Sequence, residues 1–128
     1  VGIADESVRY GRDEHPQARS EDKIVYQDYS GTIEHIGGDS IWGNYGLSDG
    51  SRTGMELNME SNPRSLTFFN DDEEQPNFII NIPKAVRIFC YFGNKGASFK
   101  INKFEFLSTP TARHGEGSRA LEYGKEWK

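Results

Sequence analysis

The sequence has one cysteine, no long apolar run and fewer basic than acidic residues, and each shortage excludes a class of protein. A single cysteine, Cys90, cannot form a disulfide within the chain, so the chain is not a disulfide-stapled secreted scaffold. No stretch approaches the ~20 apolar residues that cross a bilayer. No asparagine lies in an N-x-S/T glycosylation acceptor. We therefore expect an intracellular, cytoplasmic protein with no membrane partner.

The sequence also lacks the common patterns of catalytic and metal-binding residues. The formal net charge of −5 argues against nucleic acid as a partner. The three histidines, His15, His35 and His114, lie far apart and without the ligand spacing of a zinc site. Neither a phosphate-binding glycine loop nor a nucleophile elbow is present. We expect no enzyme, no metal and no cofactor, although spacing alone leaves a glycosidase-like carboxylate pair open.

One acidic run, residues 71–74, invites a metal-binding interpretation. Consecutive residues of a strand point in alternate directions, so the four carboxylates cannot all face one ion. A solvated hairpin tip that discourages edge-to-edge aggregation explains the run more simply. Calcium binding is the alternative, because hard oxygen ligands are at hand.

The residues that are abundant indicate one all-β domain. A chain of 128 residues suffices for a single domain, and its fourteen glycines and five prolines indicate frequent turns. Apolar and polar residues alternate in short runs, which is typical of half-buried strands. We expect strands at residues 1–4, 24–27, 32–36, 52–59, 65–70, 77–81, 86–92 and 97–107. Residues 108–128 are polar and predict an irregular tail.

Alternation within these runs predicts which side chains face the core. Six apolar residues fall in register with polar neighbours, and they are Met55, Leu57, Leu66, Phe68, Ile88 and Ile101. The phase slips within 97–107, where Phe104 and Phe106 lie on the face opposite to Ile101. Either a β-bulge near Asn102 or Lys103, or a strand buried on both sides, would explain the slip.

Two consecutive runs resemble the central hairpin of SPRY domains. Arg52–Met59 corresponds to the family's "D-x-I-G-x-x-x-D" strand, and Arg64–Phe69 to its "T-L-x-F-F-x-N-G" strand. The match continues in order through Gly2–Ala4, Tyr26 with Ser30–Ile33, Gln75–Phe78, Asn81–Pro83, Val86–Phe92 and Ala97–Ile101. It covers residues 1–107, and Val1 aligns with a mid-domain strand, so the opening third of the domain is missing. Asp71-Asp72 replaces the family's N-G turn, which requires a non-glycine residue in the left-handed conformation.

The resemblance implies a bent antiparallel two-sheet β-sandwich that binds peptides or protein surfaces through loops at one end, without catalysis. If successive strands are antiparallel, alternate connections share an end, which would bring loops 5–22 and 37–51 together. Arginine and aromatic residues are enriched at binding hot spots. The candidate protein-binding residues are Arg9, Arg12, His15, Arg19, Trp42 and Tyr45. In the alternative interpretation, Trp42 packs beneath its own glycine-rich loop.

We therefore predict a protein–protein interaction module. A structural subunit of a large intracellular assembly and a lectin-like carbohydrate binder are the alternatives. Because the opening strands are missing and the polar tail cannot order itself, we expect the chain to depend on other polypeptide for stability. Tyr123 and Trp127 are the expected anchors of the docking tail, since aromatic side chains offer a large contact area at little entropy cost.

Overall fold

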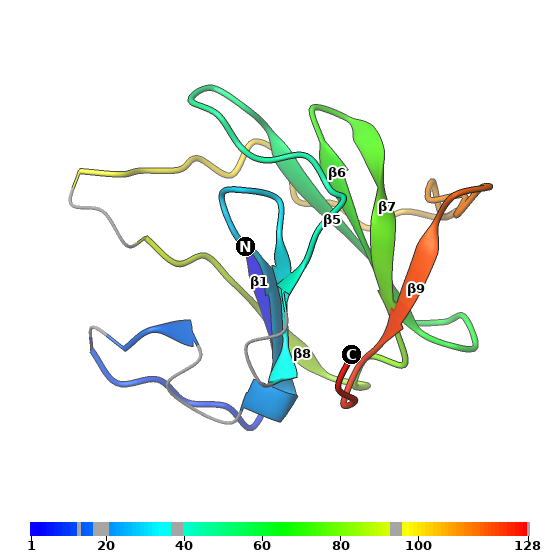
Figure 1. Ribbon diagram of the computed structural model, residues 1–128, viewed down its shortest axis with the longest axis horizontal. Coiled ribbons are helices and arrows are strands. Elements are labelled where there is room, and N and C mark those ends of the chain that lie inside the picture. Colours follow the sequence, from blue (N-terminus) through cyan, green and yellow to red (C-terminus); the bar gives the residue numbers. More distant parts are fainter. Residues whose placement is uncertain (13, 17–20, 37–39, 93–95, 128) are drawn as a thin grey trace.

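The chain forms a two-layer β-sandwich, which confirms the all-β prediction (Figure 1). The computed structural model describes residues 1–12, 14–16, 21–36, 40–92 and 96–127, so Arg19 lies outside the described residues. One sheet has the order β4-β3-β2-β1-β8 and the other the order β5-β6-β7-β9. The strands of the first sheet are β1 (Gly2–Asp5), β2 (Ile24–Gln27), β3 (Ile33–Glu34), β4 (Ser40–Ile41) and β8 (Val86–Phe89). Those of the second are β5 (Thr53–Asn58), β6 (Ser65–Asn70), β7 (Glu73–Ile80) and β9 (Arg119–Glu122).

The core lies between the sheets and takes apolar side chains from both. Leu66 and Phe68 of β6 have no exposed surface, as their alternation predicts. Met55 and Leu57 are partly buried and pack against this core from β5, which is the outermost strand of its sheet. The remaining buried members are Ile3, Val25, Ile33, Ile41, Ile79, Ile82 and Leu121.

The prediction of a core position is wrong for two of the six residues. Ile88 is 46% exposed because β8 is an edge strand, and Ile101 is 67% exposed. The strand expected at residues 97–107 does not form; its described residues have no ladder partner, and Phe104 and Phe106 are 83% and 91% exposed. The slip in apolar phase therefore reflects an extended segment without a sheet, and neither a bulge nor a strand buried on both sides.

The hairpin between β6 and β7 is tighter than expected. Its turn is Asp71-Asp72 alone, with φ of 49° and 68°, so two aspartates adopt the left-handed conformation that the missing glycine would have supplied. β7 consequently starts at Glu73, and the rest of the acidic run belongs to the strand.

Two carboxylates of the second sheet bind residues 111–114 of the tail, a segment that we call the strap. Glu56 of β5 accepts hydrogen bonds from the N–H groups of Thr111 and Ala112, both at 3.0 Å. Glu74 of β7 accepts a further pair, from the next two residues along the chain, at 2.7 and 2.8 Å. Beyond this strap the tail is not irregular, because β9 pairs in parallel with β7. The tail thus adds a strand to the sandwich.

The end of the tail docks on a buried histidine. Tyr123 and Trp127 pack against the core, and both rings lie 5.0 Å from the His35 ring. The Nδ1 atom of His35 bonds to the carbonyl of Ile24, and its Nε2 atom accepts a hydrogen bond from the N–H of Gly124 at 2.8 Å. We expected other polypeptide to hold these anchors; in the structure the chain's own sandwich holds them.

Truncation of a core side chain tests the packing against an exposed control. We expect Leu66→Ala to lower the free energy of unfolding by ~2–5 kcal/mol, because the side chain is fully buried. Ile101→Ala should change it by less than about 0.5 kcal/mol, because Ile101 is mostly exposed. Urea titration followed by circular dichroism measures both; equal losses would contradict the core described here.

Docking of the tail should depend on pH. Burial lowers the pKa of His35, and a neutral ring is required for Nε2 to accept the Gly124 N–H. Below about pH 6.5 the histidine is protonated in the unfolded or undocked chain, whereas the docked histidine stays neutral. The free energy of unfolding therefore falls as the pH drops from about 6.5 toward the lower pKa of the folded state.

Fluorescence of Trp127 in a Trp42→Phe variant reports this docking. Between pH 7 and pH 5 we expect a red shift as the tail leaves His35. His35→Phe keeps a ring for stacking and should abolish the pH dependence, whereas His114→Asn should retain it. A pH-independent spectrum in the protein with His35 would contradict the prediction.

Candidate functional site

The candidate binding residues, which we expected at one end of the sandwich, lie at two opposite ends. β4 adds a reversal of the chain that the sequence interpretation missed, so Trp42 and Tyr45 follow β4 at the end that also holds turns 28–31 and 71–72 (Figure 1). Arg9, Arg12 and His15 belong to the connection from β1 to β2, which leaves β1 at the opposite end. The prediction of a shared end is therefore wrong.

Residues of the β1–β2 connection fold back over the outer face of the first sheet. Tyr10 lies 6.3 Å from the ring of Phe89, and His15 lies 5.0 Å from the ring of Tyr91. The guanidinium of Arg9 donates to carbonyls of its own loop, at 2.5 and 3.0 Å. These contacts indicate that the β1–β2 connection covers the first sheet, and they argue against a free binding surface there.

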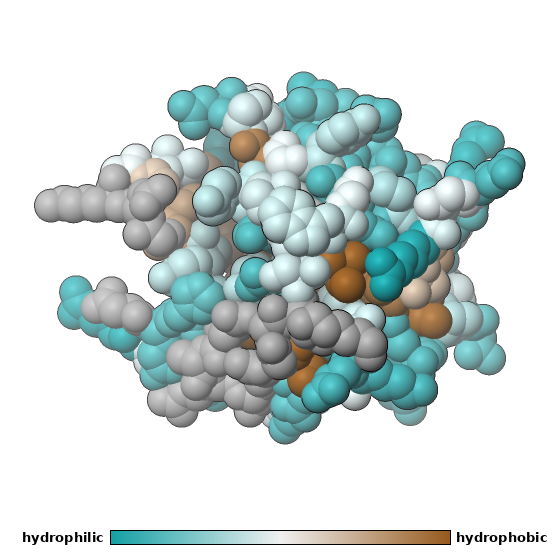
Figure 2. Space-filling model, viewed as in Figure 1, coloured by the Kyte–Doolittle hydropathy of each residue, from teal (hydrophilic) through white to brown (hydrophobic). Residues whose placement is uncertain are grey.

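Three aromatic side chains project from the other end. Tyr29, Trp42 and Tyr45 are 80%, 73% and 62% exposed, and we call this trio the aromatic end. Their exposure rules out the interpretation in which Trp42 packs beneath its own loop. Figure 2, in the same view, shows mostly pale residues of intermediate hydropathy over the connection that follows β4. Tyr29 was missed from sequence, although its position after Asp28 in a four-residue turn is a signal for exposure.

The two loops of the aromatic end contact each other backbone to backbone. A Cβ atom at Gly31 would lie 2.3 Å from the carbonyl oxygen of Asn44, and one at Gly46 would lie 2.9 Å from that of Tyr29. The N–H of Leu47 donates to the carbonyl of Tyr29 at 2.7 Å. Glycine is required at both positions because no side chain fits between the loops.

A buried amide joins this end to both sheets. The Nδ2 group of Asn44 donates to Oε1 of Gln27 in β2 at 2.8 Å, and its Oδ1 accepts the N–H of Asn77 in β7 at 2.9 Å. All three residues are at most 7% exposed. Hydrogen bonds in such a site are strong, and an unpaired partner there is costly. Asn44 therefore fixes the loop to the first and second sheets at once.

Further amide bonds fix the backbone that carries the aromatic rings. The N–H of Tyr45 donates to Oε1 of the buried Gln75 at 2.7 Å. The Nδ2 group of Asn77 donates to the carbonyl of Trp42 at 3.0 Å. The rings are thus exposed while their backbone is held, which lowers the entropy that a ligand must overcome on binding.

The aromatic end carries negative charge. Its connections, residues 28–31, 42–52 and 71–72, hold four aspartates and one arginine. Arg52 pairs with Asp72 at 2.6 Å, and its N–H donates to Asp71 at 2.8 Å. The carboxylates of Asp28 and Asp49 add to the acidic surroundings of the rings.

The described residues hold neither a metal cluster nor a membrane-spanning helix. Within the described part of the chain, no group of three His, Cys, Asp or Glu side chains is placed to hold a metal ion. None of the described helices has the length and apolar character needed to cross a membrane. Scans against protein-family models, curated proteins and solved structures each returned no match. The SPRY resemblance therefore stays a prediction that rests on the order and spacing of its motifs.

Removal of the bridging amide should be costly. Asn44→Ala leaves buried polar groups of Gln27 and Asn77 without their partner, and we expect a loss of about 3 kcal/mol in the free energy of unfolding. Asn102→Ala is the matched control, because Asn102 is exposed and should cost less than about 0.5 kcal/mol. Urea unfolding measures both, and equal small effects would show that Asn44 does not bridge the sheets.

Proposed function

We propose that the chain is a non-catalytic protein-recognition module whose aromatic end binds a polypeptide segment bearing arginine or lysine. The observation that carries the proposal is the exposure of Tyr29, Trp42 and Tyr45 on loops with a fixed backbone. Buried amides hold the backbone of Trp42 and Tyr45, and the N–H of Leu47 holds the carbonyl of Tyr29. Large aromatic side chains exposed on a fixed backbone are the typical anchors of protein interfaces.

Electrostatics select the kind of segment. A cationic side chain over a tyrosine or tryptophan ring gains a cation–π interaction of ~0.5–2 kcal/mol. The nearby aspartates add attraction for the same cation and repel an acidic segment. Aromatic rings and carboxylates at one end thus favour a basic partner. The SPRY resemblance supports the same function, because it implies recognition of peptides by loops at an end of the sandwich.

A second candidate is the structural subunit of a large assembly. It is favoured by a separate observation. Several large apolar side chains are exposed between residues 88 and 107, and they outnumber the three exposed aromatic side chains of the aromatic end. Contiguous exposed apolar surface marks a contact with another molecule. The two roles are compatible, since they use different parts of the surface.

Selection from a random peptide library displayed on phage tests the proposed function. We expect enrichment of sequences with arginine or lysine, and Tyr29→Ala should weaken their binding by about 30-fold or more, the loss typical of a hot-spot residue. Tyr91→Ala is the matched control, because Tyr91 is an exposed tyrosine that lies against His15. Enrichment of acidic sequences, or equal losses in both variants, would overturn the proposal.

A further inference from the structure

One edge of the sandwich is open between the two sheets. β5 and β8 are the outermost strands of their sheets, and each pairs with a neighbour on one side only among the described residues. An edge strand presents a row of N–H and C=O groups that can pair with another strand. On the opposite side the sheets end in β4 and in the C-terminal strand β9, which pairs with β7.

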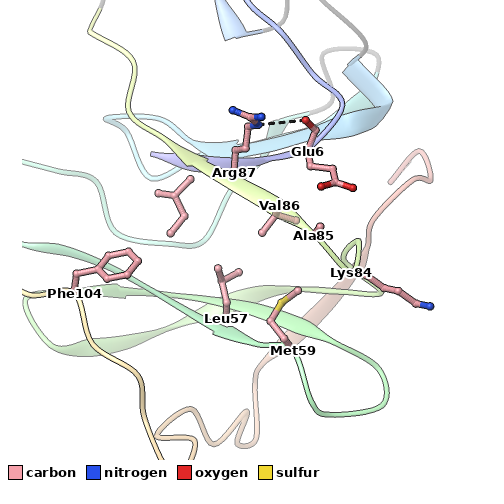
Figure 3. Close-up of a pocket in the computed structure, with 9 residues that line it drawn as sticks. Glu6, Leu57, Met59, Lys84, Ala85, Val86, Arg87 and Phe104 are labelled. Carbon is pink, nitrogen blue, oxygen red and sulfur yellow. Dashed lines mark hydrogen bonds between the residues drawn. The ribbon is translucent and has the colours of Figure 1, made fainter.

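An apolar groove of about 530 Å³ runs along this open edge. Figure 3 shows Leu57 and Met59 reaching up from the β5 side toward Val86 on the β8 strand, with Phe104 beside them. Ile88 completes the apolar lining, and it is 46% exposed. The groove is therefore an open depression at the surface, bounded by side chains of both sheets.

Exposed apolar surface continues from the groove along the chain that follows β8. The large apolar residues exposed there are Tyr91, Phe92, Phe99, Ile101, Phe104, Phe106 and Leu107. A run of this kind exceeds the scattered apolar residues that a monomer exposes, and it marks a surface that another molecule covers.

The charge of this edge is opposite to that of the whole chain. Residues 84–107 contain five lysines or arginines and one glutamate, whereas the chain as a whole has a net charge of −5. Lys84 and Arg87 stand at the groove itself, where Arg87 donates to the carbonyl of Glu6 at 3.2 Å. Glu6 also lines the groove, so two basic residues face one carboxylate and the rim of the apolar groove carries a net positive charge.

We propose that the open edge binds an extended, apolar strand of a partner protein whose flanking residues are acidic. Backbone groups of β8 would pair with the strand, alternate apolar side chains would enter the groove, and the flanking carboxylates would meet Lys84 and Arg87. A lipid surface fits less well, because a flat bilayer cannot fill a concave groove or pair with a strand edge. This second surface goes beyond the proposed function, since it lies apart from the aromatic end and carries the opposite charge.

Synthetic peptides test this inference on the full 128-residue chain. The probe is a labelled peptide of alternating valine and threonine with glutamates at both ends. One comparison peptide carries lysines in place of the glutamates, and another carries a central proline, which cannot pair as a strand. Fluorescence anisotropy should show at least about tenfold tighter binding of the glutamate-flanked probe than of either comparison peptide, the equivalent of one good charge-pair interaction.

Charge reversal at the groove gives a matched set of variants. Lys84→Glu combined with Arg87→Glu should reverse the preference toward the lysine-flanked peptide. Arg113→Glu makes the same change at an exposed residue of the strap and should leave the preference unchanged. Tyr29→Ala should also leave it unchanged, which separates this surface from the aromatic end. Hydrogen exchange should slow at the amides of β8 when the probe binds.

Four results would overturn the inference. Equal affinity for all three peptides would exclude strand pairing and charge selection. No binding to any of them would exclude the proposed occupant. Sedimentation with phosphatidylserine vesicles, without peptide binding, would assign the edge to a lipid surface. Self-association of the chain that the Lys84/Arg87 double variant abolishes would assign it to a second copy.

Discussion

The side-chain amide of Asn44 is the contact on which the functional end of the sandwich depends. It bonds to Gln27 in one sheet and to Asn77 in the other, and all three residues are buried. An apolar residue there would leave buried groups unpaired, and a longer one would separate the sheets. Because the amide also belongs to the loop that carries Trp42 and Tyr45, one residue couples the spacing of the sheets to the position of the exposed rings.

The two edges of the sandwich differ in what lies beside their outermost strands. On one side the tail extends the second sheet, since β9 pairs with β7 and becomes its outermost strand. On the other side β5 and β8 remain at the edge, with apolar side chains between them. The acidic aromatic end and the basic open edge are suited to partners of opposite charge.

Local patterns predicted the strands whose contacts are local. β2 and β6 have the expected bounds. Leu66 and Phe68 are buried as predicted, because they alternate with Ser65 and Thr67 and so share one face of the strand. β4 escaped detection because two residues carry no period, and its omission placed Trp42 at the wrong end. The parallel pairing of β9 and the buried bonds of Asn44 depend on residues distant in sequence, so no local pattern predicts them.

The amide proton of Tyr45 offers the most direct test that the exposed rings stand on a fixed backbone. Tyr45 is 62% exposed and lies in a loop, yet its N–H donates to the buried Gln75 side chain. Native-state hydrogen exchange followed by NMR compares it with the amides of β6. We expect the Tyr45 amide to be protected nearly as strongly as the amides of β6. Exchange as fast as that of the unpaired loop amides would contradict it.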